Sequence, residues 1–318
     1  MNHRLTAAGI ALMMLGCVPA AAQSLWAPKG QSRYAPPHKP ITRIADLKAR
    51  HAGHADWREL IVDDEHLRGE YIQSSPGSKT PRRVHPDTRI WWIVMDGQVR
   101  FDIEGQQPLV ASKGSMVQVP MQTLYSMETV GDKPALYFET NIAGTRTLYE
   151  SETAAPKLPG LQWIPVRFAR RSGVWEQDNK PHTTFAELAS GLEEGKLKGT
   201  VRVVQDDRGA ANFIYGYEKN LPPIDPRQKG HYHPECAEFW LIMAGQIRYP
   251  IEGQGVLIAE VGDVVYVPRN TWHFPRWYGP GPSCRLAMNG YPYISHLFDA
   301  TEPEPARKRD TGRPPSTK

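Results

Sequence analysis

The chain carries the same stretch of sequence twice, and this internal repeat restricts its fold more than any other feature. Residues 83–125 align with residues 231–273 at a constant offset of 148, without a gap, and 18 of the 43 aligned positions are identical. The similarity continues upstream with small gaps, because residues 44–64 parallel residues 185–207. A match of this length indicates that the chain consists of two copies of one structural unit.

Each copy has the composition of a β-structure. The repeated core is rich in Ile, Val, Trp and Phe, and the pairs Asp96-Gly97 and Ala244-Gly245 lie where hairpin turns are expected. The 27 glycines and 29 prolines of the chain suit many short strands joined by turns. We therefore predict an all-β fold of two tandem barrels, each preceded by a short amphipathic helix.

The repeat also sets the predicted domain boundaries. An N-terminal barrel is expected over residues 43–150 and a C-terminal barrel over residues 183–300. Residues 151–182 form a Pro-rich linker, in which the sequence WIPVRF is a candidate edge strand, and residues 23–42 form a Pro-rich N-terminal segment. Residues 301–318 lack large apolar side chains and are predicted to be a disordered tail.

Residues 1–22 have the pattern of a signal peptide. Arg4 is followed by a short apolar run that ends at Cys17, and three alanines then suit cleavage before Gln23. We therefore expect export to the periplasm or the cell exterior, while a lipid anchor at Cys17 and a buried N-terminal helix remain open as alternatives. The apolar run is too short to span a bilayer and no longer run follows, so no stable membrane insertion is expected.

Two features of the composition bear on the cross-links and partners of the mature chain. Export would permit a disulfide between Cys236 and Cys284, although Cys236 is equally suited to be a buried thiol. The net charge is +4 and the basic residues are spread along the chain. Since a nucleic-acid footprint requires clustered basic residues, no nucleic-acid partner is predicted.

The second copy contains side chains suited to bind a metal ion. His231 and His233 are two residues apart and would point to the same side of a strand, while Glu238 begins the next strand. His273 follows a further strand. Three imidazoles and one carboxylate are suitable ligands for a divalent first-row transition metal. We predict one such ion per chain, held by these four residues.

The same residues match two sequence motifs of the cupin family. The first motif is matched by His231, His233, Glu238 and Gly245, and the second by Gly262, Pro268 and His273. Asn270 stands where the family often has glycine, and asparagine also tolerates positive φ. The chain thus resembles a bicupin over roughly residues 43–300. The resemblance implies two jelly-roll barrels and a bound Fe, Mn, Cu, Ni or Zn ion.

The first copy has lost the equivalent metal ligands. At the offset of 148, the positions of His231, Glu238 and His273 are occupied by Arg83, Ile90 and Tyr125, and His85 alone is kept. Because arginine and isoleucine cannot ligate a metal, we predict that this barrel binds none. Ile90, Trp92 and Val94 are expected to pack its interior, with His85 an ordinary core or rim residue.

Four residues near the predicted ligands are candidates for a substrate pocket: Trp240, Arg269, Arg276 and Trp277. Trp240 lies two residues after Glu238 and so on the same face of its strand. An arginine near the metal would suit an anionic substrate. The alternative for the aromatic residues is that they belong to the barrel core.

The cupin resemblance leaves three functions open. The first is an exported metal-dependent oxidoreductase, most concretely a dioxygenase acting on a small aromatic or organic acid, because two-barrel exported relatives such as quercetinases have this activity. The second is a metal-dependent lyase or isomerase, and the third is a non-enzymatic periplasmic protein that binds a small ligand or a metal. A small molecule is the expected partner in each case, and a homo-oligomer is compatible with the sequence.

Overall fold

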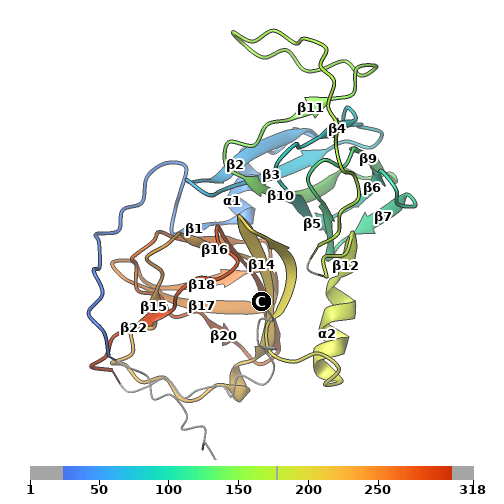
Figure 1. Ribbon diagram of the computed structural model, residues 1–318. Coiled ribbons are helices and arrows are strands. Elements are labelled where there is room, and N and C mark those ends of the chain that lie inside the picture. The colour runs from blue at the N-terminus through green and yellow to red at the C-terminus, as the bar shows by residue number, and fades with distance from the viewer. Residues whose placement is uncertain (1–23, 177, 303–318) are drawn as a thin grey trace, which may run out of the picture.

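The described part of the chain forms two β-barrels that pack against each other (Figure 1). The computed structural model describes residues 24–302 except residue 177. The predicted signal peptide, the alternative lipid anchor at Cys17 and residues 303–318 of the predicted tail lie outside these residues. Within them, β-strands predominate over two short α-helices, which confirms the predicted fold class.

The N-terminal barrel consists of two sheets, with the strand orders β12-β8-β5-β10-β3-β2 and β11-β4-β9-β6-β7. Its strands are β2 (Trp57–Asp63), β3 (Leu67–Ser74), β4 (Arg83–Val84), β5 (Ile90–Asp96), β6 (Gln98–Ile103), β7 (Leu109–Ser112), β8 (Ser115–Val119), β9 (Tyr125–Val130), β10 (Ala135–Ile142), β11 (Leu148–Tyr149) and β12 (His182–Thr184). Neighbouring strands are antiparallel throughout.

The C-terminal barrel repeats this plan. Its large sheet has the order β1-β19-β16-β21-β14-β13, and the smaller sheets are β18-β17-β20 and β15-β22. The strands are β1 (Ile41–Thr42), β13 (Val201–Asp206), β14 (Gly209–Tyr217), β15 (His231–Tyr232), β16 (Glu238–Ala244), β17 (Gln246–Ile251), β18 (Gly255–Glu260), β19 (Val264–Val267), β20 (Arg276–Tyr278), β21 (Pro282–Asn289) and β22 (Leu297–Phe298). A 3-10 helix, η1 (Glu218–Asn220), follows β14.

The two barrels exchange short edge strands. β1 precedes the N-terminal barrel in sequence but pairs with β19 of the C-terminal barrel, with Ile41 opposite Val265. In the same way, β12 follows the linker but pairs with β8 of the N-terminal barrel. Each exchanged strand leads into a helix, α1 (Ile44–Arg50) or α2 (Phe185–Glu193). The exchange covers one edge of each large sheet and ties the barrels together.

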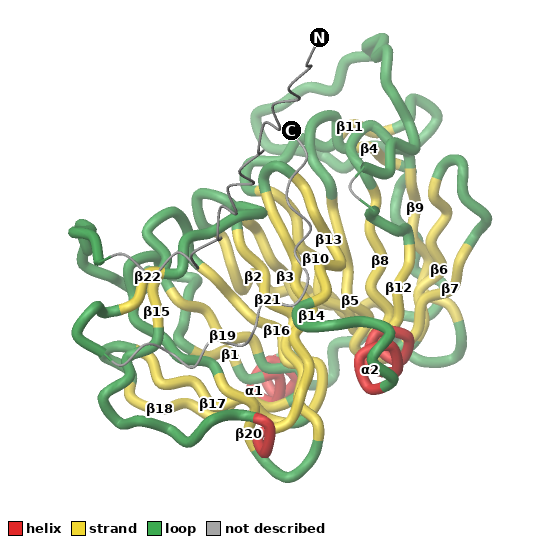
Figure 2. The backbone as a smooth tube through the Cα atoms, turned by 60° about the horizontal axis from the view of Figure 1, so that its bottom comes forward, coloured by secondary structure: helices red, strands yellow, loops and turns green. Residues whose placement is uncertain are grey.

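A shared apolar layer lies between the two large sheets, which stand side by side in Figure 2. Trp91 and Ile93 of β5 face this layer, whereas Ile90, Trp92 and Val94 point into the N-terminal barrel, as predicted. Because both faces of β5 are covered, its sequence is a continuous apolar run instead of an alternating one.

The remaining sequence predictions concern the cysteines and the linker. Cys236 and Cys284 are buried free thiols, and burial raises the pKa of Cys236 to about 12, which makes it a poor nucleophile. No strand forms between β11 and β12 in the described chain, so the candidate edge strand at WIPVRF is wrong. Instead, Trp163 Nε1 donates to the carbonyl of Pro156 at 2.8 Å, and Ile164 is exposed. Neither helix of the described residues is long and apolar enough to cross a membrane.

Candidate metal centre

The four predicted ligands come from neighbouring segments of the C-terminal barrel. His231 begins β15, Glu238 begins β16, and His233 lies in the turn between them. His273 lies in the connection from β19 to β20, where two backbone hydrogen bonds join it to His231, one from each amide, at 3.1 and 2.9 Å. This pairing brings the second sequence motif beside the first.

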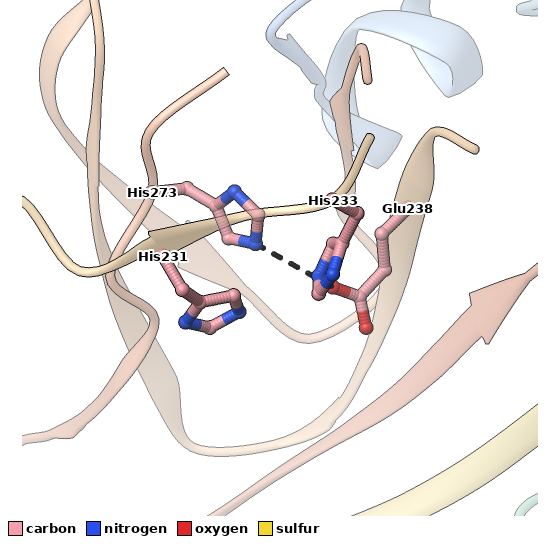
Figure 3. A group of neighbouring side chains, drawn as sticks. All are labelled: His231, His233, Glu238 and His273. Atoms are coloured by element: carbon pink, nitrogen blue, oxygen red, sulfur yellow. Dashed lines mark hydrogen bonds and ion pairs between the residues drawn. The ribbon is translucent and has the colours of Figure 1, made fainter. Parts of the chain in front are cut away.

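The ligand atoms of these side chains converge (Figure 3). One ligand atom of each residue lies within 4.8 Å of those of the other three. Nε2 of His233 is 3.0 Å from Oε2 of Glu238, and Nε2 of His273 is 3.5 Å from the same oxygen. His231 alone of the four is partly exposed, so the solvent-facing side of the cluster is at His231.

Backbone carbonyls orient two of the imidazoles. Nδ1 of His233 donates to the carbonyl of Ser295 at 2.7 Å, and Nδ1 of His273 donates to the carbonyl of Thr271 at 2.9 Å. A hydrogen on Nδ1 leaves Nε2 of each ring to present a lone pair to a metal.

The electrostatics of the cluster favour a charged carboxylate beside the imidazoles. Burial lowers the pKa of His231 well below its ordinary value, and the neighbouring histidines lower it further. Burial also tends to lower the pKa of His233, but its hydrogen bond to Glu238, the negative charge of that carboxylate and its hydrogen bond to the Ser295 carbonyl together raise this pKa. Burial alone would raise the pKa of Glu238, yet its contacts with the imidazoles hold it well below the usual range. Glu238 is therefore anionic, as a metal ligand must be.

The donor set fits a transition-metal ion. Nε2 of His273 is buried without a hydrogen-bond partner, which costs about 1–3 kcal/mol unless a cation coordinates it. Three imidazole nitrogens and a carboxylate oxygen suit Fe, Mn, Cu, Ni or Zn. The cluster thus fits a single metal, which would supply Lewis acidity and, for a redox-active ion, electron transfer. Other groups of this kind are absent from the described residues.

Comparison with known proteins assigns the family. Two stretches of the chain, residues 71–141 and 218–288, match the model of the Cupin domain family. The chain is a bicupin. It is similar to quercetin 2,3-dioxygenase of Bacillus subtilis (strain 168), with 23% identity over 304 residues that cover 83% of this chain and 86% of that protein.

Solved structures show the same fold. The bicupin resembles salicylate 1,2-dioxygenase from Pseudaminobacter salicylatoxidans with a TM-score of 0.61 and 11% identity, over 86% of this chain and 90% of that one. An adduct of salicylate 1,2-dioxygenase with gentisate gives a TM-score of 0.60 and 11% identity, over 86% and 87% of the two chains. At this identity, the likeness establishes the fold alone.

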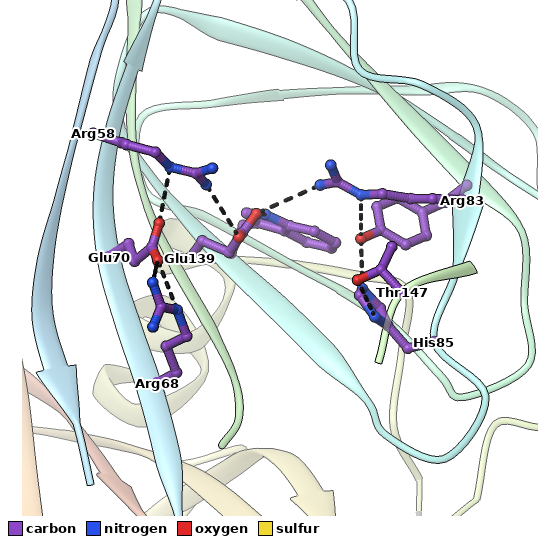
Figure 4. Close-up of polar contacts among 9 residues, drawn as sticks. Arg58, Arg68, Glu70, Arg83, His85, Glu139 and Thr147 are labelled. Atoms are coloured by element: carbon purple, nitrogen blue, oxygen red, sulfur yellow. Dashed lines mark hydrogen bonds and ion pairs between the residues drawn. The ribbon is translucent and has the colours of Figure 1, made fainter. Parts of the chain in front are cut away.

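A polar network occupies the corresponding place in the N-terminal barrel of the bicupin (Figure 4). Nε of Arg83 donates to the hydroxyl of Tyr125 at 2.8 Å, and the same hydroxyl lies 2.9 Å from Nε2 of His85. The guanidinium of Arg83 also lies 3.7 Å from the carboxylate of Glu139. The guanidinium of Arg83 thus places a positive charge at this position of the N-terminal barrel. Tyr125 packs in the barrel core and also forms polar contacts through its hydroxyl group.

We expect the purified bicupin to hold one metal ion per chain. The C-terminal barrel has a convergent donor set, whereas the N-terminal barrel has Arg83 and Ile90 in place of two of the ligands. Elemental analysis of protein saturated with metal and then freed of excess would measure the stoichiometry. Two tightly held ions per chain would contradict the assignment of the N-terminal barrel.

The buried His85 is expected to make stability depend on pH. Burial lowers its pKa to about 4, whereas the unfolded value is about 6.5. The unfolded chain therefore binds more protons between these values, and the stability that neutral His85 contributes is complete above about pH 6.5 and is lost as pH falls towards 4. Between pH 7 and 4.5, urea unfolding should show a loss about 2 kcal/mol larger for the wild type than for His85→Gln. Equal losses would refute this.

The two aromatic residues of the predicted pocket belong to the barrel interior. Trp240 is fully buried, and its ring centroid lies 5.3 Å from that of His273. Trp277 is buried in the same apolar cluster. The ring of Trp240 thus packs against that of a metal ligand.

The two predicted pocket arginines have other partners. The guanidinium of Arg276 donates to the carbonyl of Pro222. Arg269 is exposed and forms an ion pair of 3.1 Å with Glu65, which belongs to the turn between β2 and β3. Both charges are therefore engaged by protein groups.

Sequence reasoning missed His296. Its ring centroid lies 4.7 Å from those of both His231 and His233. The repeat gives only a weak indication of its position. Thr147-Leu148-Tyr149 corresponds to His296-Leu297-Phe298 in the second copy, but at an offset of 149 instead of 148.

Proposed function

We propose that the bicupin is a metal-dependent dioxygenase that acts on a small aromatic or organic acid. The observation that carries this proposal is the cluster of three histidines and one glutamate, of which only His231 is partly exposed. A metal held by four protein ligands has positions left for a substrate or for O2. The similarity to quercetin 2,3-dioxygenase over most of both chains supports the same reaction class.

The residues of the site have distinct tasks in this proposal. His231, His233, Glu238 and His273 hold the ion, and the carbonyls of Ser295 and Thr271 keep two imidazoles in the tautomer that can bind it. The fully buried Trp240 excludes water from the inner side of the cluster. A substrate must then enter from the side of His231.

Oxygen uptake tests this function. Protein loaded separately with Fe(II), Mn(II), Cu(II), Ni(II) or Zn(II) is mixed with flavonols and hydroxybenzoates, and a dioxygenase should place both atoms of labelled O2 in the product. Glu238→Ala is the matched control and should show no uptake. Turnover without O2 consumption would identify a lyase or isomerase, and tight binding without turnover a ligand-binding protein.

We also propose that the bicupin is exported. The support is the sequence of residues 1–22, with its basic, apolar and small-residue regions in order. Mass spectrometry of the protein from its native cell should find a mature chain that begins near Gln23. Functional protein that retains Met1 would rule out this proposal.

A further inference from the structure

The segment that follows β21 crosses the solvent-facing side of the metal cluster and places His296 there. The carbonyl of Ser295 accepts the hydrogen bond from His233. The next residue, His296, is exposed, and its ring lies against those of both His231 and His233. β22 then pairs with β15 and fixes this position. A molecule that approaches the cluster from solvent therefore meets His296 beside the one partly exposed ligand.

The N-terminal barrel contains the same hairpin with a different residue at this point. Phe298 of β22 lies opposite the first residue of β15, just as Tyr149 of β11 lies opposite the first residue of β4. Counting back two residues from each, Thr147 occupies the place of His296.

The preceding carbonyl confirms this correspondence. Arg146 accepts from Nδ1 of His85 at 3.1 Å, as Ser295 accepts from Nδ1 of His233 at 2.7 Å. The hairpin thus forms with either threonine or histidine at the next position. The hairpin geometry therefore does not require a histidine at position 296. The histidine occurs in the barrel that has the complete set of metal ligands.

The position and the ring nitrogens of His296 indicate what it can recognise. It is outside the group of four side chains whose ligand atoms converge within 4.8 Å, so it stands beside the cluster. A neutral imidazole carries a hydrogen on one ring nitrogen and a free lone pair on the other. The nitrogen without the hydrogen is an acceptor. A hydroxyl group of an incoming molecule could donate a hydrogen bond to this acceptor nitrogen at the entrance to the cluster.

We propose that His296 is a specificity-determining residue that accepts a hydrogen bond from a hydroxyl group of the substrate at the open side of the metal cluster. This inference rests on the proposed function and narrows its substrates to hydroxylated aromatic or hydroxy acids. Trp240 is fully buried against His273 on the inner side, so a bound substrate would place its hydroxyl group on the side of His296.

Binding of a matched pair of probes to the metal-loaded full chain tests the inference. Salicylate carries a hydroxyl group that benzoate lacks, and calorimetric titration gives a dissociation constant for each. His296→Leu should weaken salicylate binding about 10-fold, the effect of one hydrogen bond, and leave benzoate binding unchanged. His296→Gln keeps an acceptor and should restore most of the affinity. The control Thr147→Leu, at the matching place in the N-terminal barrel, should alter neither.

Several outcomes would overturn the inference. Equal losses for both probes, or no loss for either, would show that His296 does not read the hydroxyl group. A fall in metal content of His296→Leu would make the residue a ligand, and a wild type that does not distinguish the probes would remove the basis of the proposal. Oxygen uptake by the same samples separates the two hypotheses. If the protein distinguishes salicylate from benzoate but consumes no oxygen, only the dioxygenase proposal is refuted. If oxygen is consumed and the KM of His296→Leu is unchanged, only the role of His296 is refuted.

Discussion

Bicupin carrying Glu238→Ala is expected to lose its metal, and with it any activity. Glu238 is the anionic member of the donor set, and without it a divalent ion would face three neutral imidazoles. His273→Ala should have a similar effect, because it removes the ligand that the second motif supplies. Loss of an outer-sphere partner already lowers metal affinity by roughly 10–100-fold, so loss of a direct ligand should lower it at least as much. Metal content after dialysis, measured on each variant, is the readout.

The internal repeat supplies the matched controls. Ile90→Ala and Tyr125→Ala change the positions that correspond to Glu238 and His273 in the N-terminal barrel. Both side chains are buried, so each change should lower the free energy of unfolding by roughly 1–5 kcal/mol. The folded fraction should keep its metal. Full metal occupancy in Glu238→Ala and His273→Ala would place the site elsewhere and remove the basis of the proposed function.

The repeat made the barrels and the ligand set predictable from sequence. Trp92 and Trp240 correspond at the offset of 148, and each is fully buried in the interior of its own barrel. Asn270, at the departure from the family motif, has a φ of 64°, and its counterpart Gln122 has a φ of 62°. The turn is therefore the same in both barrels, and the left-handed conformation explains why glycine is common there.

The exchanged edge strands were not predictable by the same reasoning. β1 has two residues and β12 has three, too few to show an alternating pattern. Their partners are more than sixty residues away in sequence, as Thr183 and Met116 illustrate. Only the packing of two complete sheets decides which edge such a short strand joins.

The pocket prediction included two adjacent residues that cannot both face the site. Arg276 and Trp277 are adjacent in β20, and adjacent side chains of a strand point to opposite faces. Since Trp277 packs in the barrel core, Arg276 points outward to the carbonyl of Pro222. His296 escaped prediction for another reason, because one added residue before β22 breaks the constant offset of 148 that relates the rest of the two copies.

Gly230→Ala is expected to disrupt the metal site without changing any ligand. Gly230 has a φ of +88°, and a Cβ placed on it would lie 2.0 Å from the carbonyl oxygen of His273. That oxygen accepts the hydrogen bond from the amide of His231, which joins the two sequence motifs. The backbone must move to admit the methyl group, and the two ligands should separate. We expect a large fall in metal content and a loss of about 3 kcal/mol or more in unfolding free energy.

Gly253→Ala is the control that separates the steric clash at Gly230 from the cost of placing alanine in a left-handed conformation. Gly253 also has a positive φ, +75°, but its added Cβ would have no neighbour within 4 Å. This variant should lose only about 1–2 kcal/mol, the cost of the left-handed conformation, and should keep its metal. Metal content and urea unfolding of the two variants, measured side by side, give the comparison. If Gly230→Ala matched Gly253→Ala in both measurements, the close approach of Gly230 to His273 would not be what aligns the ligands, and other contacts, such as the β16–β19 ladder and the bridge from Ile251 to His273, would have to position the second motif.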